Sequence, residues 1–243
     1  MRSLSASELL DVWERGLSQS SIQRALTLLT AACPESPPDK LFNFSIGQRD
    51  GLLLTLREQM FGSQLVSFAV CPGCGDRLEL SFTVNDIRIA PEIKPVPVLS
   101  LKVEDYEVQF RLPNSRDLVA VSQSDLRTMR QQLLACCILS ASLDSATLSL
   151  ADLPATVINA VLAEMAQVDP QADVQLLLSC PGCHHQWLVT FDVVSFLWSE
   201  IDALARRLLR EVHTLAAIYG WREADILAMS PQRRQLYLEM IGG

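Results

Sequence analysis

Cys71-Pro72-Gly73-Cys74 and Cys180-Pro181-Gly182-Cys183 are two copies of one tetrapeptide, and the rest of this 243-residue chain is arranged around them. Each copy lies between two short apolar runs, so each predicts a β-hairpin with a pair of thiols at its tip. Two Cys-x-x-Cys turns supply the four ligands of a tetrahedral zinc site. The four strands are expected at Leu65–Val70, Leu78–Val84, Val174–Ser179 and Trp187–Val193.

We therefore predict one structural Zn²⁺ per chain, in a zinc ribbon whose two halves are separated by 105 residues. A catalytic zinc needs an open coordination position, and four thiolates leave none. A redox function is the alternative for a single Cys-x-x-Cys, but redox pairs normally open a helix and occur once. His184 or His185 could replace one cysteine as a ligand, or both could be solvated at the hairpin rim. The predicted ligands are Cys71, Cys74, Cys180 and Cys183.

The charge balance argues against a nucleic-acid partner. The chain carries 20 basic and 28 acidic residues, a net charge of −8, and no run of Lys or Arg. Its hydrophobic fraction of 49% is high, yet no stretch approaches the roughly 18 apolar residues of a membrane span. The N-terminus lacks an apolar run of signal-peptide length. Cys33, Cys136 and Cys137 are expected to be small buried hydrophobic residues in a reducing compartment, so we expect a cytoplasmic protein.

The pattern predicts an α+β chain that is mostly helical. In the first part, Ser5 and Glu8 form a capping box, a second helix runs from Ser20 to Cys33, and a third leads from Ile46 to Phe61. We divide the sequence into N-terminal helices, a split zinc ribbon, an inserted β-hairpin and helical subdomain, and C-terminal helices. These segments are 1–62, 63–84 with 174–193, 85–173, and 194–243.

The inserted subdomain contains a third predicted hairpin, turning at Glu104-Asp105. A helical region then begins with Asn114 or Ser115 as its cap and continues to Leu139. A further helix is expected from Pro154 to Val168, with Asp152 as its cap. The insertion is thus a hairpin plus helices whose ends are joined by one metal ion.

The C-terminal segment begins with a helix whose apolar residues recur every three or four positions as far as Tyr219. The unit that follows, Trp221 to Met240, combines aromatic residues, Met and Arg, which are enriched in the cores of protein interfaces. The alternative is that this unit folds back and completes the protein's own core, a reversal that Gly220 permits. The expected partner-binding residues are Trp221, Arg222, Met229, Arg233, Arg234 and Tyr237.

Several short motifs, taken in order, resemble one known family. They are Gly47-x-Arg49-Asp50, Phe61-Gly62, Phe110-Arg111-Leu112-Pro113-x-Ser115-Arg116-Asp117-Leu118, the two Cys-x-x-Cys pairs, and the run from Tyr219 to Leu238. The chain resembles the T-even phage baseplate protein family, described as baseplate hub assembly chaperones and encoded with contractile tails and phage-tail-like injection systems. The resemblance extends from Leu4 to Ile241. Some members lack one or both cysteine pairs, so the zinc prediction rests on this sequence and not on the family.

The resemblance implies an assembly factor or minor component of a contractile injection apparatus, which binds baseplate or hub proteins and has no enzymatic activity or small-molecule substrate. It leaves open whether the protein stays in the finished particle. The alternative is a nucleic-acid-binding or transcriptional zinc-ribbon protein, which would show salt-dependent binding. A hydrolase is a third possibility, but the sequence has no Gly-x-Ser-x-Gly, Walker loop or His-Glu-x-x-His.

Overall fold

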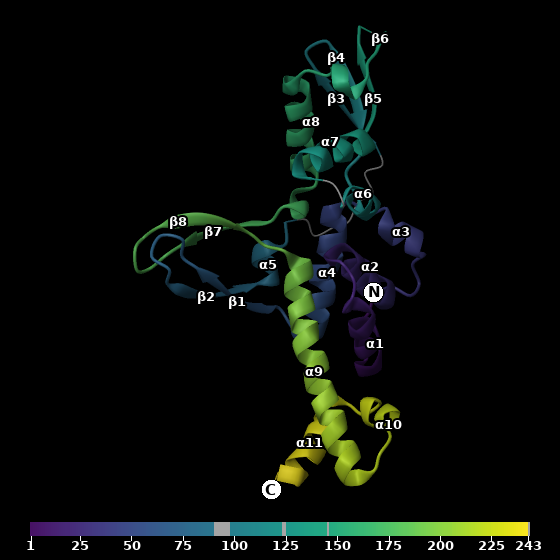
Figure 1. The fold of residues 1–243 in the computed structure, drawn as a ribbon, viewed down its shortest axis with the longest axis vertical. Coiled ribbons are helices and arrows are strands. Elements are labelled where there is room, and N and C mark those ends of the chain that lie inside the picture. The colour runs from purple at the N-terminus through teal and green to yellow at the C-terminus, as the bar shows by residue number, and fades with distance from the viewer. Residues whose placement is uncertain (90–97, 123–124, 145, 243) are drawn as a thin grey trace. The chain divides into compact units, whose positions relative to one another are not determined.

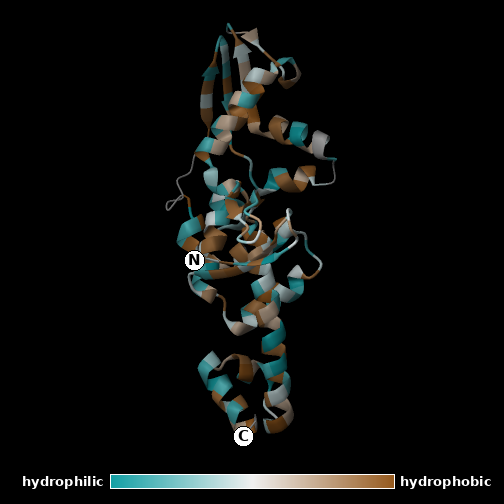
Figure 2. Cartoon of the chain, turned by 90° about the vertical axis from the view of Figure 1, so that its left-hand side faces the viewer, coloured by the Kyte–Doolittle hydropathy of each residue, from teal (hydrophilic) through white to brown (hydrophobic). Residues whose placement is uncertain are grey.

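The computed structural model describes residues 1–89, 98–122, 125–144 and 146–242, and the chain forms two compact units. The first unit combines residues 1–35 with residues 193–243, and the second comprises residues 36–192 (Figure 1). Bands of apolar and polar residues alternate along the helices (Figure 2), as expected when one side of a helix is buried and the other is solvated. Among the described helices, none is long and apolar enough to cross a membrane.

The first unit is helical. Its elements are α1 (Ala6–Gly16), α2 (Ser21–Ala32), α9 (Val193–Tyr219), α10 (Glu223–Leu227) and α11 (Pro231–Gly242). The predicted capping box of Ser5 and Glu8 is confirmed at the start of α1, and Ser20 with Gln23 forms another at α2. Helices α1 and α2 pack on each other and on α9, whose buried positions include Leu197, Ile201, Ala205 and Leu208.

A tight contact around Trp198 fixes how α1 and α2 meet α9. The Trp198 ring lies so close to Gly16 that a Cβ at Gly16 would be 2.1 Å from it. The Arg24 guanidinium lies over the same ring, 4.4 Å from its centroid. On the neighbouring turn, the Trp13 indole donates a 2.8 Å hydrogen bond to the Asp202 carboxylate. The three helices therefore have a defined register.

The second unit is mixed. Its helices are α3 (Pro38–Phe42), α4 (Ile46–Phe61), α5 (Val84–Ile87), α6 (Ser115–Val121), α7 (Leu126–Cys137) and α8 (Ala155–Val168), with short 3₁₀ turns η1 (Leu150–Asp152) and η2 (Pro170–Ala172). Its strands are β1 (Gln64–Val70), β2 (Arg77–Thr83), β3 (Leu99–Val103), β4 (Tyr106–Phe110), β5 (Ile138–Leu143), β6 (Ala146–Thr147), β7 (Gln175–Ser179) and β8 (Gln186–Thr190). The expectation of a mixed helix and sheet chain is confirmed.

The third predicted hairpin is present as β3 and β4, but it is half of a larger sheet. The helical region expected to reach Leu139 ends at Cys137, and the chain continues as β5, which pairs antiparallel with β4. The resulting sheet has the order β3-β4-β5-β6, and α8 covers one face through a core that includes Val108, Phe110 and Val157. Ile138 and Ala141 pack into this core, and long-range packing of this kind overrides a local helical pattern.

Of two predicted helix caps, one is confirmed and the other is wrong. Asn114 caps α6, because its side chain accepts from the backbone N–H groups of Arg116 and Asp117. Asp152 was expected to cap α8 but lies in η1, where its carboxylate accepts from the Ser149 hydroxyl. Pro154 occupies the N-cap position of α8 instead, without a side-chain hydrogen bond.

Candidate metal centre

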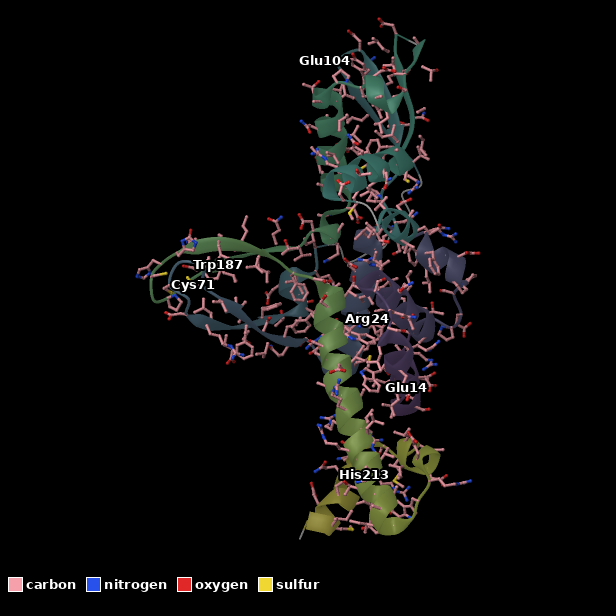
Figure 3. All side chains as sticks on the ribbon, in the orientation of Figure 1. Glu14, Arg24, Cys71, Glu104, Trp187 and His213 are labelled. Carbon is pink, nitrogen blue, oxygen red and sulfur yellow. The ribbon has the colours of Figure 1, made fainter. Side chains whose placement is uncertain are left out.

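Two separate antiparallel hairpins carry the cysteine pairs, β1 with β2 and β7 with β8. In both, inward and outward side chains alternate: in β1, Leu65 is buried whereas Val66 and Phe68 are exposed. Phe82 and Phe191 meet edge to face at 5.7 Å, joining the ends of the two hairpins opposite to the cysteines. Figure 3 marks Cys71 and Trp187 on the two hairpins.

The two cysteine turns have the same backbone design. In the first turn, the N–H of Cys71 donates to the carbonyl of Asp76, and the N–H of Gly75 donates to the carbonyl of Cys71. In the second turn, the N–H of Cys180 donates to the carbonyl of His185, and the N–H of His184 donates to the carbonyl of Cys180. All four hydrogen bonds are 2.9 Å long. The residue after each second cysteine has positive φ, 81° at Gly75 and 60° at His184. Each turn therefore places its two sulfurs on one side.

The four sulfurs converge in one cluster. Cys71 Sγ lies 3.6 Å from Cys183 Sγ, and Cys74 Sγ lies 3.5 Å from Cys180 Sγ, so both of these contacts cross between hairpins. All four sulfurs lie within 4.8 Å of one another. A tetrahedral ion with metal–sulfur distances of about 2.3 Å requires sulfur–sulfur separations of about 3.8 Å. The four thiols can therefore hold one metal ion, and Cys71 and Cys180 form its buried side.

The thiols influence one another's ionisation. Burial would raise the pKa of Cys71, but hydrogen bonds from the backbone N–H groups of Cys74 and Gly73 lower that pKa to about 7. At Cys74, a backbone hydrogen bond from Asp76 favours the thiolate, yet burial and the other three sulfurs raise the pKa. The pKa of Cys183 is raised as well. Four thiolates this close repel one another, and a bound cation removes that repulsion.

The histidines lie outside the four-sulfur cluster. His185 stacks on Trp187 with ring centroids 5.9 Å apart, and its Cβ lies 3.2 Å from where a Cβ on Gly73 would be. The second turn has an equivalent contact, because the Asp76 carboxylate of the first hairpin lies 2.8 Å from where a Cβ on Gly182 would be. A side chain from each turn thus covers the glycine of the other. A Cβ at either glycine would therefore require the covering side chain of the other turn to shift.

The bases of the two hairpins are tied together independently of any metal. Gln171, just before β7, is buried and bonds both the carbonyl of Ile87 and the N–H of Ile89, which follow β2. Asp169 accepts a 2.9 Å hydrogen bond from the N–H of Gly47 at the start of α4. Burial raises the pKa of Asp169 despite this bond. The sequence pattern had singled out Gly47 but not the residues that contact it.

The remaining three cysteines are not members of the four-sulfur cluster. Cys33 and Cys137 are buried, and Cys136 is half-buried. Burial raises the pKa of Cys33, and it raises the pKa of Cys137 to about 12. A high pKa keeps a thiol protonated and unreactive.

The residues expected to bind a partner fall into different environments. Arg234 is only 3% exposed: its Nε lies 3.0 Å from the Glu211 carboxylate of α9, and its Nη1 donates to the carbonyl of Met229. Its guanidinium is therefore bonded within the unit. Trp221 and Tyr237 are half-buried in an aromatic cluster with Tyr219. Arg222 and Arg233 are exposed, and Met229 is half-buried.

The second unit also contains a cavity of about 550 Å³, which no sequence motif predicted. Its walls come mainly from α7, α8 and η2, and they are mostly apolar, with Arg130, Asp169 and Asp173 as charged groups. The residues that line it are far apart in sequence, so no local motif marks them.

The profile of the family described as T4 bacteriophage base plate protein matches residues 6–198. The match includes all four clustered cysteines and ends within α9, so α10 and α11 lie outside it. No curated protein and no solved structure matches the chain. Because the profile covers well over half of its residues, the chain belongs to the T4 bacteriophage base plate protein family.

Proposed function

We propose that this chain is a non-enzymatic assembly factor (chaperone) or minor structural component of the baseplate or hub of a contractile phage tail or tail-like injection system. The observation that carries the proposal is the family match over residues 6–198, which includes both cysteine turns. Two distinct compact units and exposed apolar side chains on the cysteine hairpins suit a protein that joins others rather than one that transforms a small molecule. Before incorporation, the protein would be cytoplasmic.

The roles of assembly factor and component are separated by one experiment. Deletion of the gene should give particles with missing or incomplete base plates in electron micrographs, and the wild-type gene supplied in trans should restore them. Mass spectrometry of purified wild-type particles then decides between the two roles, because a component is retained in the particle and an assembly factor is not. Normal, infective or contractile particles from the deletion strain would contradict both roles.

We further propose that the four-cysteine cluster holds a structural zinc ion. Four convergent thiols fit a closed tetrahedral site with no position for a substrate, as in a zinc ribbon. Elemental analysis of protein purified without added metal should find about one zinc per chain. A Cys74→Ser variant should lose that zinc, whereas Cys136→Ser should retain it. Iron in place of zinc, or zinc retained by Cys74→Ser, would overturn this part of the proposal.

Partner recognition is assigned to the segment from Trp221 to Met240. Its exposed arginines and its aromatic and Met side chains are of the types that interfaces favour. Arg234 takes part only indirectly, by holding α11 against α9 through Glu211. Arg233→Ala should weaken association with a base plate protein while leaving thermal stability unchanged. Arg234→Ala should lower thermal stability first, because it leaves a half-buried Glu211 with one partner fewer.

A further inference from the structure

One side of α11 contributes nothing to the protein's own core. Arg233, Leu236 and Met240 follow one another at helical spacings of three and four, so they share one side of the helix, here called the α11 face. Leu236 is 53% exposed and Met240 is 70% exposed. Leu236 and Met240 thus give this helix an exposed apolar stripe, and contiguous apolar surface of this kind is what protein partners cover.

The packing of α11 within its own unit uses other residues. Arg234 faces inward onto Glu211 and Met229, and Tyr237 meets Tyr219 and Trp221, with ring centroids 5.8 and 4.8 Å away. These contacts fix the rotation of α11 about its axis. The α11 face therefore points to solvent as a consequence of satisfied internal packing, and no rearrangement of the helix is needed to present it.

The charge of this region differs from that of the rest of the chain. Residues 205–242 contain six arginines and four carboxylates, whereas the whole chain has 20 basic and 28 acidic residues. Three of the arginines other than Arg234 have carboxylate partners within 4 Å, namely Arg206, Arg207 and Arg222. Among the described residues, Arg210 and Arg233 form no ion pair; Arg233 instead lies over the Tyr237 ring. Its guanidinium also donates a 3.5 Å hydrogen bond to the Tyr237 hydroxyl. Cations without an internal carboxylate partner are available to carboxylates of another protein.

We propose that the α11 face docks into an apolar groove of another base plate protein, and that the rim of this groove carries Asp or Glu side chains. Leu236 and Met240 would fill the groove, and Arg233 would pair with the rim, the arrangement of a helix face laid in a groove. A nucleic acid fits less well, because the most exposed side chains at the centre of the face are apolar. This inference rests on the proposed function, since it names the kind of partner for the same segment.

The test uses full-length, zinc-loaded chain and each base plate protein of the same particle, produced singly. Binding is measured by titration calorimetry at 50 and 300 mM NaCl. One base plate protein should bind the wild-type chain, more weakly at high salt, because an arginine and a carboxylate attract each other less when screened. Leu236→Asp should weaken binding at least about tenfold, as expected for a buried anchor at an interface. Arg233→Glu should weaken it about fivefold or more and abolish most of its salt dependence.

Leu17→Asp is the matched control, because Leu17 is 52% exposed in the same unit and lies outside α11. It should bind as the wild type does, and all variants should melt within a few degrees of one another because the altered side chains are exposed. If a base plate protein binds the wild type and Leu236→Asp equally well, the proposal that the α11 face is the binding surface is refuted, while the proposed function stands. If the chain self-associates and Leu236→Asp abolishes this, or if the chain binds a DNA duplex in a salt-dependent way, the proposal that the partner is another base plate protein is refuted. If no base plate protein binds the wild type, the proposed function itself fails.

Discussion

Replacing Cys74 by serine tests how much of the second unit's stability depends on the metal centre. Cys74 lies at the first hairpin tip, 3.5 Å from Cys180 across the cluster, and 105 residues separate the two in sequence. A cross-link that closes a loop of about 100 residues removes conformational entropy from the unfolded chain worth about 4.7 kcal/mol. We expect Cys74→Ser to lose the zinc ion and, with it, this cross-link. We therefore expect the variant to lose about 3–5 kcal/mol of unfolding free energy.

Trp187 provides a local signal for this measurement, because it is the one tryptophan in residues 36–192 and stacks on His185 beside the cluster. Replacing the other three tryptophans by phenylalanine in both proteins would leave fluorescence that reports on the second unit alone. Urea unfolding of the Cys74→Ser protein should then show a much lower midpoint than that of its parent. Cys136→Ser, outside the cluster, should change the midpoint little. Equal midpoints for Cys74→Ser and its parent would refute the argument that the metal closes this loop.

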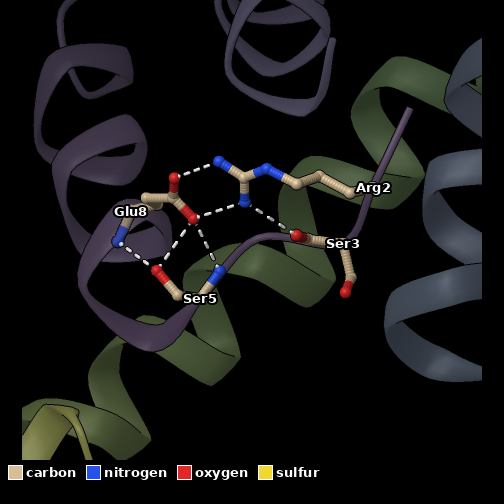
Figure 4. A network of polar contacts seen from close by, with 4 residues as sticks. All are labelled: Arg2, Ser3, Ser5 and Glu8. Carbon is tan, nitrogen blue, oxygen red and sulfur yellow. Dashed lines mark hydrogen bonds and ion pairs between the residues drawn. The ribbon is translucent and has the colours of Figure 1, made fainter. Parts of the chain in front are cut away.

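Three further outcomes are expected. Gly16→Ala should lower the melting temperature, at a cost of about 1–3 kcal/mol, because the new Cβ would lie 2.1 Å from the Trp198 ring. Gly51→Ala, with no atom within 4 Å of its Cβ, should instead stabilise α4 by about 0.5–1 kcal/mol. Equal effects of the two substitutions in thermal melts would contradict this. The hydrogen bonds from Arg2 and then Ser5 lower the pKa of Glu8 to about 2 from 4.5 (Figure 4), so its contribution to stability is complete above about pH 4.5 and is lost as the pH falls toward 2. The difference in melting temperature between the wild type and Glu8→Gln should shrink over that pH range, and a difference that is constant with pH would argue against the ion pair. The chain should not bind DNA or RNA at about 150 mM salt, because its net charge of −8 repels phosphate, and sub-micromolar binding that falls steeply with salt would contradict this.

The cysteine cluster could be predicted from the sequence because the ligands come in pairs with fixed spacing. A Cys-x-x-Cys turn specifies its own local geometry, and four thiols have few arrangements other than convergence on one ion. The capping box of Ser5 and Glu8 is local for the same reason, because it joins a side chain and a backbone group only three residues apart. These two predictions depend on a few neighbouring residues and are confirmed, whereas the equally local prediction that Asp152 caps α8 was wrong.

Features that depend on distant neighbours were not predicted. The strand at Ile138–Leu143 follows directly from a helix, and only its pairing with β4, about thirty residues earlier, makes it a strand. Similarly, the reason for glycine at position 16 lies in Trp198, and the reason for glycine at position 47 lies in Asp169. A single sequence carries no sign of which residues meet across such separations.

The burial of Arg234 is another feature that could not be predicted from the sequence, and it helps to decide which residues of the candidate interface to replace. Arginine and aromatic side chains are common both at interfaces and in the contacts that hold a short helix in place, so composition alone cannot sort Arg233 from Arg234. Helix rotation does sort them: neighbouring residues point about 100° apart. Arg234 is buried and pairs with Glu211 on α9, whereas Arg233 is exposed. Loss of partner binding in Arg234→Ala is thus uninformative about direct contact, whereas the same loss in Arg233→Glu with an unchanged melting temperature identifies the contacting surface.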